Sequence, residues 1–142
     1  MIAIEDLKEW AMTYFKNRDI MLRRIDKIEE VDDSFIIHNI DSTTNQVKIM
    51  PGFEDSLFST FQGKTTTLVI LNSRENIDFL IANWQKFTQM KELTLMFANP
   101  DSLAEKKWIV NPYIHNKITE PKSLRAGLIS LFTTVDPVIK KG

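Results

Sequence analysis

The residues best suited to recognise a ligand form an alternating polar series in the last third of the chain. Asn111, Tyr113, His115 and Lys117 are separated by single residues. In an extended strand this spacing places all four side chains on one face, because successive side chains point to opposite sides. Their donors, acceptors, aromatic ring and cation would suit a phosphate, a nucleic-acid base or an acidic peptide. The alternative is an edge strand with a polar outer face, in which Pro112 and Lys117 discourage further pairing.

A second group of candidates follows two apolar runs that are predicted to be parallel strands. Ser73 and Arg74 come shortly after one run, and Asn99 comes after the next. Ligands of open α/β sheets favour the crevice beyond the carboxyl ends of parallel strands. Ser73 would also begin a helix, whose free N–H groups attract anions, and Arg74 would reinforce that attraction. Any stable helix needs such residues at its start, so a structural role is the alternative.

Three further residues follow the order of a nuclease motif. Asp33 precedes Gln46 and Lys48, which are separated by one residue, and the first predicted helix carries Glu5 and Glu9. This order of elements and the acid, spacer, E/Q-x-K pattern resemble the PD-(D/E)XK nuclease superfamily over roughly the first half of the chain. The resemblance implies acidic side chains that hold a divalent metal and a lysine that helps to position the attacking water. Gln46 departs from the usual acidic residue, which leaves fewer carboxylates for a hard cation.

The predicted hairpin separates these three residues. If the chain turns tightly at Ser42-Thr43, Lys48 lies opposite Ile37 or His38. Asp33 is then about four to five residues further along the sheet, or roughly 15 Å away, because a strand rises about 3.3 Å per residue. We therefore expect an ordinary hairpin. The three residues would converge only if a longer loop took up the end of the first hairpin strand.

The composition removes several classes of protein. The 142 residues include 18 Lys and Arg against 19 Asp and Glu, and the formal net charge is -1. Broad binding to nucleic-acid phosphates is therefore disfavoured. We predict that the arginines within residues 16–27 pair with Asp19 and Asp26 on a solvated face. With no Cys and only two His, the chain has no thiolate zinc site, disulfide or thiol nucleophile. We expect no metal and no cofactor.

The hydrophobic pattern positions these candidates on an α/β (or α+β) fold, a single-domain mixed sheet of about five to six strands. The order is a helix, a three-strand meander, a short helix, a strand, a helix, a strand, an extended segment and a final helix. The predicted ranges are helix 4–17, strands 20–31, 34–40 and 46–50, a short helix near 57–61, strand 68–71, a helix after Ser73, strand 93–98, extended segment 107–118, and helix 124–135. The unit from 68 to 98 should form a parallel crossover.

The function that these observations favour is a small non-catalytic binding module whose partner is a protein. No complete catalytic set can be assembled from the residues present, which weighs against an enzyme. The alternatives are a degenerate PD-(D/E)XK-like metal-dependent nuclease and a domain that binds a small anion such as phosphate or a nucleotide. No apolar run reaches the roughly 20 residues that span a bilayer, so we expect a cytoplasmic protein without a membrane partner. The oligomeric state is left open.

Overall fold

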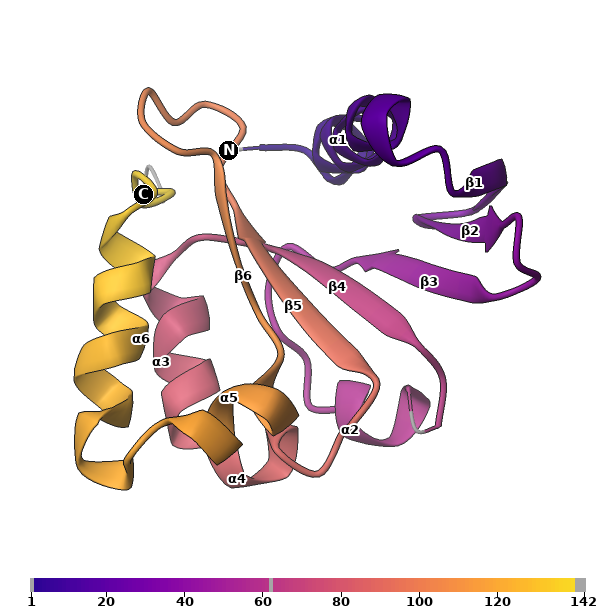
Figure 1. Cartoon of the computed structure of the whole chain (residues 1–142). Coiled ribbons are helices and arrows are strands. Elements are labelled where there is room, and N and C mark those ends of the chain that lie inside the picture. The colour runs from indigo at the N-terminus through magenta and orange to yellow at the C-terminus, as the bar shows by residue number, and fades with distance from the viewer. Residues whose placement is uncertain (1, 62, 140–142) are drawn as a thin grey trace.

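The computed structural model describes residues 2–61 and 63–139, which form a six-stranded sheet with helices on both faces (Figure 1). The strands lie side by side in the order in which they occur in the chain. They are β1 (Ile25–Val31), β2 (Ser34–Asn39), β3 (Thr44–Ile49), β4 (Thr66–Leu71), β5 (Leu93–Ala98) and β6 (Lys107–Val110). The helices are α1 (Ile4–Leu22), α2 (Leu57–Thr60), α3 (Arg74–Ala82), α4 (Trp84–Phe87), α5 (Pro112–Ile118), η1 (Pro121–Ser123) and α6 (Leu124–Thr133).

Two kinds of strand pairing build this sheet. β1, β2 and β3 form an antiparallel meander, β3, β4 and β5 run parallel, and β6 returns antiparallel to β5. β4 is buried along its whole length, as a continuous apolar run predicts for a strand covered on both faces. The meander joins the rest of the sheet through the parallel β3–β4 pair. The predicted α/β architecture, a mixed sheet of about five to six strands with helices, is confirmed.

One face of the sheet is covered by α1. Leu7, Ala11 and Phe15 recur every four residues, so they form a single buried stripe along the helix. This stripe packs on alternate side chains of the sheet, among them Phe35 and Val47. Figure 1 shows α1 above the meander, apart from the other helices.

The remaining helices cover the opposite face and gather mainly beneath β4, β5 and β6 (Figure 1). Their core includes the stacked rings of Phe97 and Trp108, whose centroids are 4.2 Å apart. On this face of the meander, His38, Gln46 and Lys48 are only half-buried. Within the described residues, we find no helix that is both long and apolar enough to span a bilayer.

The first helix and the first strand differ from their predicted bounds. α1 continues to Leu22, and β1 begins only at Ile25. The side chain of Asp19 accepts the backbone N–H groups of Arg24 and Ile25, which stabilises the turn between the two elements. The helix predicted after Ser73 is divided at residue 83 into α3 and α4.

The extended segment predicted over residues 107–118 is wrong beyond Val110. β6 ends there, and α5 begins at Pro112. The side chain of Asn111 accepts the backbone N–H of Ile114 at 3.1 Å, which is the hydrogen bond of a helix N-cap. Proline fits the first helical position because an N–H at that position would have no partner inside the helix.

Candidate functional site

Helix α5 separates the four polar residues that were predicted to share a strand face. Asn111 caps the helix, whereas Tyr113 and Lys117 lie one turn apart, with Lys117 Nζ donating to the Tyr113 hydroxyl at 2.8 Å. His115 instead meets Trp84 edge-on, with ring centroids 5.8 Å apart. The prediction of a common polar strand face is therefore wrong. Of the four residues, the structure brings only Tyr113 and Lys117 into side-chain contact.

Two lysines flank the phenol of Tyr113. Lys117 Nζ lies 4.1 Å from the ring centroid, and Lys91 Nζ lies 5.6 Å from it. The hydrogen bond from Lys117, together with the charges of Lys117 and Lys91, lowers the pKa of Tyr113 below its ordinary value. Both lysines are exposed at the surface. An exposed lysine pair attracts anions only weakly through water, so this cluster is a poor candidate for a binding site.

Ser73, Arg74 and Asn99 lie at the carboxyl ends of β4 and β5, but each is used by the fold. Ser73 Oγ accepts a backbone N–H in the first turn of α3 at 3.2 Å, so the predicted N-cap is confirmed. Arg74 pairs with Asp78 one turn later, with 3.4 Å between Nε and Oδ1. Asn99 Nδ2 donates to the backbone carbonyl of Asp136 at 2.9 Å. The three side chains therefore have structural partners.

The segment that follows α6 covers the same edge of the sheet. The buried side chain of Asn72 donates to the carbonyls of Phe132 and Val135 at 3.1 and 3.0 Å, and the backbone carbonyl of Asn72 accepts the N–H of Val138. The strand order also never reverses from β1 to β6, so the sheet lacks the switch point at which the ligand crevice of open α/β sheets forms. Across the described residues, this edge is filled by the chain itself.

The strand register brings Asp33 nearer to Lys48 than a tight hairpin would. The tight turn predicted at Ser42-Thr43 is wrong, because the loop 40–43 takes up the end of the first hairpin strand. Lys48 therefore pairs with Ser34, the residue that directly follows Asp33. Asp33 is therefore one position away from the residue opposite Lys48, instead of the four to five positions expected for a tight hairpin.

This closer register does not by itself create a metal site. Gln46 and Lys48 lie on the sheet face turned away from α1, because they alternate with side chains that pack on α1. Asp33 is an exposed turn residue that lines a hollow of about 260 Å³ with Glu5 and Glu9. Over the described ranges, no three or more His, Cys, Asp or Glu side chains are arranged to hold a metal ion. The described residues around Asp33 therefore supply no cluster of three metal ligands.

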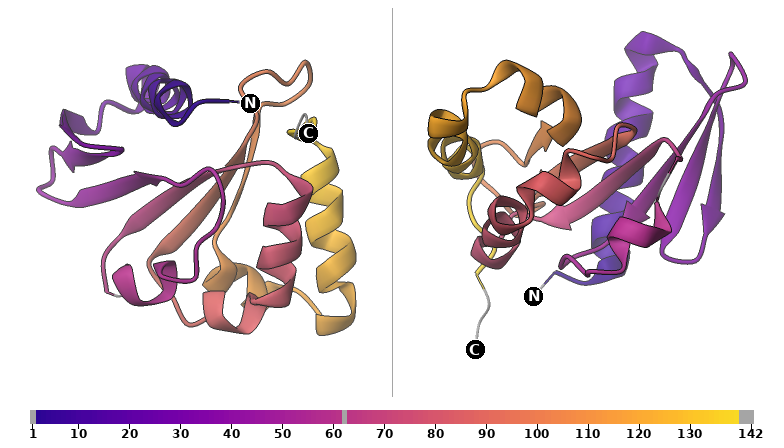
Figure 2. Two further views of the ribbon diagram at one scale, coloured as in Figure 1. Left: turned by 180° about the vertical axis from the view of Figure 1, so that it is seen from behind. Right: turned by 90° about the horizontal axis from the view of Figure 1, so that it is seen from below.

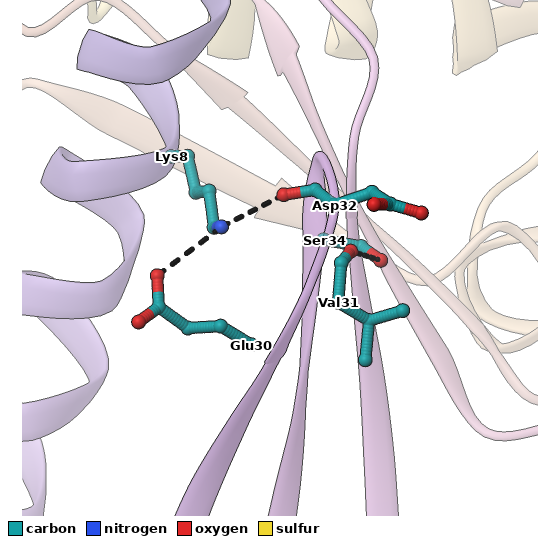
Figure 3. Close-up of polar contacts among 5 residues, drawn as sticks. All are labelled: Lys8, Glu30, Val31, Asp32 and Ser34. Atoms are coloured by element: carbon teal, nitrogen blue, oxygen red, sulfur yellow. Dashed lines mark hydrogen bonds and ion pairs between the residues drawn. The ribbon is translucent and has the colours of Figure 1, made fainter.

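Lys8 has a structural role in this acidic hollow (Figure 3). Its Nζ lies 3.2 Å from Oε1 of Glu30 and donates to the backbone carbonyl of Asp32 at 2.8 Å. Within the same turn, Ser34 Oγ donates to the carbonyl of Val31 at 2.9 Å. The two Lys8 contacts join α1 to the turn between β1 and β2, and the Ser34 hydrogen bond lies within that turn.

A groove between α1 and the loop before β6 gathers aromatic and basic side chains. Trp10 and Tyr14 lie one helical turn apart, with ring centroids separated by 5.9 Å and planes inclined by 16°. The guanidinium carbon of Arg18 lies 5.6 Å from the Tyr14 centroid, and Lys107 Nζ lies 5.0 Å from it. We call this hollow of about 600 Å³ the α1–β6 groove. Its lining is completed by Thr13, Asn17, Ala104, Glu105 and Lys106.

The α1–β6 groove carries more positive than negative charge. Arg18, Lys106 and Lys107 line it together with a single carboxylate, that of Glu105. Lys106 Nζ donates to two backbone carbonyls of its own loop, at 3.0 and 2.9 Å, so it stabilises the groove wall. Of the ion pairs found in the described part of the chain, none involves Arg18 or Lys107. These two cations are available to an anionic partner.

The basic segment 16–27 is not salt-bridged as predicted. Asp19 Oδ1 accepts the backbone N–H groups of Arg24 and Ile25, at 2.7 and 3.1 Å. Among the residues that the structure describes, no cation of this segment forms an ion pair with Asp19 or Asp26. The Asp19 carboxylate accepts main-chain N–H groups just after the end of α1 and does not pair with a neighbouring arginine. The cations of the segment therefore stay exposed on the surface.

The sequence pattern indicates only one wall of the α1–β6 groove. Trp10 and Tyr14 fit the apolar side of an amphipathic helix, so their spacing predicts core packing. Lys107 lies in a distant part of the sequence and reaches the groove only through the β5–β6 loop. The signal that could have identified the helical wall is the four-residue spacing of Trp10, Tyr14 and Arg18, which places them on one side of α1.

Comparisons of the chain with protein-family models, with curated proteins and with solved structures find no match.

Proposed function

We propose that the chain is a non-catalytic binding module whose α1–β6 groove contacts an acidic segment of a partner protein. The observation that carries this proposal is the meeting of Trp10, Tyr14 and Arg18 in one groove. Tryptophan, tyrosine and arginine are the residue types that most often dominate the binding energy of protein interfaces. An energetic centre of this kind needs only a few such side chains, surrounded by contacts that exclude water.

Charge defines the chemistry of the partner segment. Arg18 and Lys107 lie over the Tyr14 ring, so cation–π attraction holds both cations at the groove. A Glu or Asp of the partner would form charge-assisted hydrogen bonds with the Arg18 guanidinium. An apolar partner side chain beside that carboxylate would cover the half-buried Trp10 ring.

The arrangement of the rings favours a protein over single-stranded nucleic acid. Proteins that bind single strands use open aromatic faces on which bases stack, together with a long track of cations. In the α1–β6 groove, the Tyr14 ring already carries Arg18 and Lys107 and stacks beside Trp10. Little aromatic surface is therefore left for bases.

The cytoplasmic location expected from the sequence stays a prediction.

Nuclear magnetic resonance titration of the ¹⁵N-labelled full chain tests this proposal. The probes are a short peptide with Glu residues around one Phe and a matched peptide in which Lys replaces each Glu. We expect the acidic peptide to shift the indole signal of Trp10, and Arg18→Glu to weaken its binding about tenfold or more because like charges then oppose each other. Arg125→Glu, which changes an exposed cation on α6, is the matched control and should bind like wild type.

Two results would overturn the assignment of this groove to a protein partner. One is equal affinity of the acidic peptide for wild type and for Arg18→Glu. The other is tighter binding of an oligothymidine than of the acidic peptide, with loss of the oligothymidine in Arg18→Glu. Thermal unfolding of the variant would show that its fold is retained in either case.

The second candidate function is a degenerate metal-dependent nuclease. The observation in its favour is the register that places Asp33 next to the strand partner of Lys48. Incubation of the full chain with DNA or RNA and Mg²⁺ tests it. Cleavage that is lost in Lys48→Ala and kept in Lys64→Ala would support a nuclease, and the absence of cleavage by wild type would exclude it. The anion-binding alternative has no comparable observation, because Arg74 is paired and the neighbouring sheet edge is covered.

A further inference from the structure

The last turn of α1 and the adjacent β2–β3 loop expose a cluster of aliphatic side chains. Ile20, Met21 and Leu22 are 68%, 86% and 44% exposed, and Ile40 in the loop is 68% exposed. The two segments are neighbours, because the backbone N–H of Ile40 donates to the carbonyl of Arg24 at 2.8 Å. We call Ile20, Met21, Leu22 and Ile40 the apolar tip. In the right panel of Figure 2, the end of α1 and the β2–β3 loop lie at the same end of the molecule.

The apolar tip is held in place by the main chain around it. At the end of α1, the N–H of Arg23 donates to the carbonyl of Asp19 at 2.8 Å, and the Asp19 carboxylate accepts the N–H of Arg24. In the loop, the Asp41 carboxylate accepts both the N–H and the hydroxyl of Thr43. The exposure of these aliphatic side chains is therefore a property of the folded chain, not of a frayed helix end.

Exposed cations lie beside the apolar tip in the sequence. Lys16, Arg23 and Arg24 are exposed at this end of α1, and none of them takes part in an ion pair within the described residues. The nearby carboxylates of Asp19 and Asp41 accept main-chain N–H groups and keep their charges, and Asp41 also interacts electrostatically with Arg24. Segment 16–27 nevertheless carries five cations against two carboxylates. Aliphatic side chains flanked by Lys and Arg are typical of surfaces that bind anionic lipid headgroups and insert into the boundary below them.

We propose that the apolar tip docks on an anionic lipid bilayer, with its aliphatic side chains among the headgroups and with Arg23 and Arg24 at lipid phosphates. A second copy of the chain is disfavoured, because a two-fold contact at the tip would bring the arginines of both copies together. A bilayer also needs no shaped pocket to receive a side chain as exposed as Met21. This inference does not depend on the α1–β6 groove, and it departs from the expectation, made from the sequence, that the chain has no membrane partner.

Cosedimentation of the full chain with unilamellar vesicles tests the proposal. The vesicles are phosphatidylcholine alone or phosphatidylcholine with about 30% phosphatidylserine, which carries the anionic charge. We expect partitioning to the phosphatidylserine vesicles to be about tenfold higher or more. Arg23→Glu combined with Arg24→Glu should reduce it by more than tenfold, since each basic residue near the surface contributes roughly a fivefold factor. Ile20→Ser combined with Met21→Ser should also reduce it, which separates insertion from charge.

Ile118→Ser is the matched control, because Ile118 is 78% exposed but lies on α5, outside the tip. Its partitioning should equal that of wild type. Equal partitioning of wild type to both vesicle types, or unchanged partitioning of the tip variants, would overturn the proposal. If vesicles did not bind but the acidic peptide shifted the methyl signal of Met21, the tip would be a protein contact and the lipid proposal would also fail.

Discussion

Trp108 donates its indole N–H to Oδ1 of Asn72 at 2.7 Å, and both side chains are buried. Nδ2 of the same amide donates to the carbonyls of Phe132 and Val135. One side chain therefore satisfies polar groups from β6 and from the end of α6 while it sits at the end of β4. Because buried polar groups are costly when they lose their partners, Asn72 should be important for stability.

Replacing this amide should destabilise the protein strongly. Asn72→Ala leaves the indole N–H of Trp108 without a partner and removes the hydrogen bonds to the carbonyls of Phe132 and Val135, so we expect the free energy of unfolding to fall by about 3 kcal/mol or more. Urea denaturation followed by tryptophan fluorescence measures the change. Asn83→Ala is the control, because the Asn83 side chain makes a single hydrogen bond, to the carbonyl of Phe79. A loss no larger than that of the control would contradict the structural role of Asn72.

The β2–β3 register can be tested by cross-linking, because the chain has no natural cysteine. Opposite residues of an antiparallel pair have Cα atoms about 4.5–5.5 Å apart, within the range of a disulfide. Ser34→Cys combined with Lys48→Cys should therefore form an intramolecular disulfide under mild oxidation, detected by loss of maleimide labelling. Ile37→Cys combined with Lys48→Cys corresponds to the tight hairpin and should remain labelled. The reverse outcome would restore the tight turn.

The cap of α5 should contribute measurably to stability. Asn111→Ala removes the side chain that accepts the N–H of Ile114, and the loss of such a cap costs about 1 kcal/mol of unfolding free energy. Ser123→Ala is a suitable comparison, because Ser123 occupies the N-cap of α6 without a capping side-chain hydrogen bond. We expect thermal unfolding to shift downward for the first variant and to stay near wild type for the second. Equal shifts would contradict the assignment of α5.

The phenol of Tyr113 should ionise at lower pH in wild type than after removal of its lysine partner. Lys117→Met removes the hydrogen bond and the charge that lower the pKa of Tyr113, so that pKa should rise. The phenolate absorbance can be followed in a Tyr14→Phe background, in which Tyr113 is the only tyrosine. Lys122→Met, which removes a lysine outside this contact, should leave the titration unchanged. A Lys117→Met curve that coincides with wild type would exclude the contact in solution.

The architecture was accessible from sequence where local patterns agree with tertiary burial. Leu7, Ala11 and Phe15 are spaced four residues apart, so they form a helical stripe that must pack against the sheet. The continuous apolar run of residues 68–71 must lie within the sheet, where both of its faces are covered. The segment 107–118 carries two conflicting signals. Its apolar residues alternate as in a strand, whereas one Asn-Pro pair within it is typical of the start of a helix. Asn111 and Pro112 define the start of α5, and this local helix signal prevailed over the alternation.

The candidate sites were less accessible, because they depend on register and on contacts between distant segments. A one-residue change in loop length alters every cross-strand neighbour of Lys48, and no local pattern determines that length. Charge pairing was also misjudged for Asp19, whose carboxylate binds main-chain N–H groups rather than the neighbouring arginines. The α1–β6 groove depends on the contact between Lys107 and Tyr14. These residues are far apart in the sequence and come together only in the folded protein.

Each strand of the sheet pairs with the strand made just before it. A nascent chain emerging from a ribosome would thus find the partner of every new strand already synthesised, and the sheet could grow in step with translation. Asn72 is an exception to this order. Its Nδ2 group and its backbone carbonyl gain their partners only when residues 132–138 have been made. Completion of the buried hydrogen-bond network is therefore deferred to the final stage of synthesis, after all six strands exist.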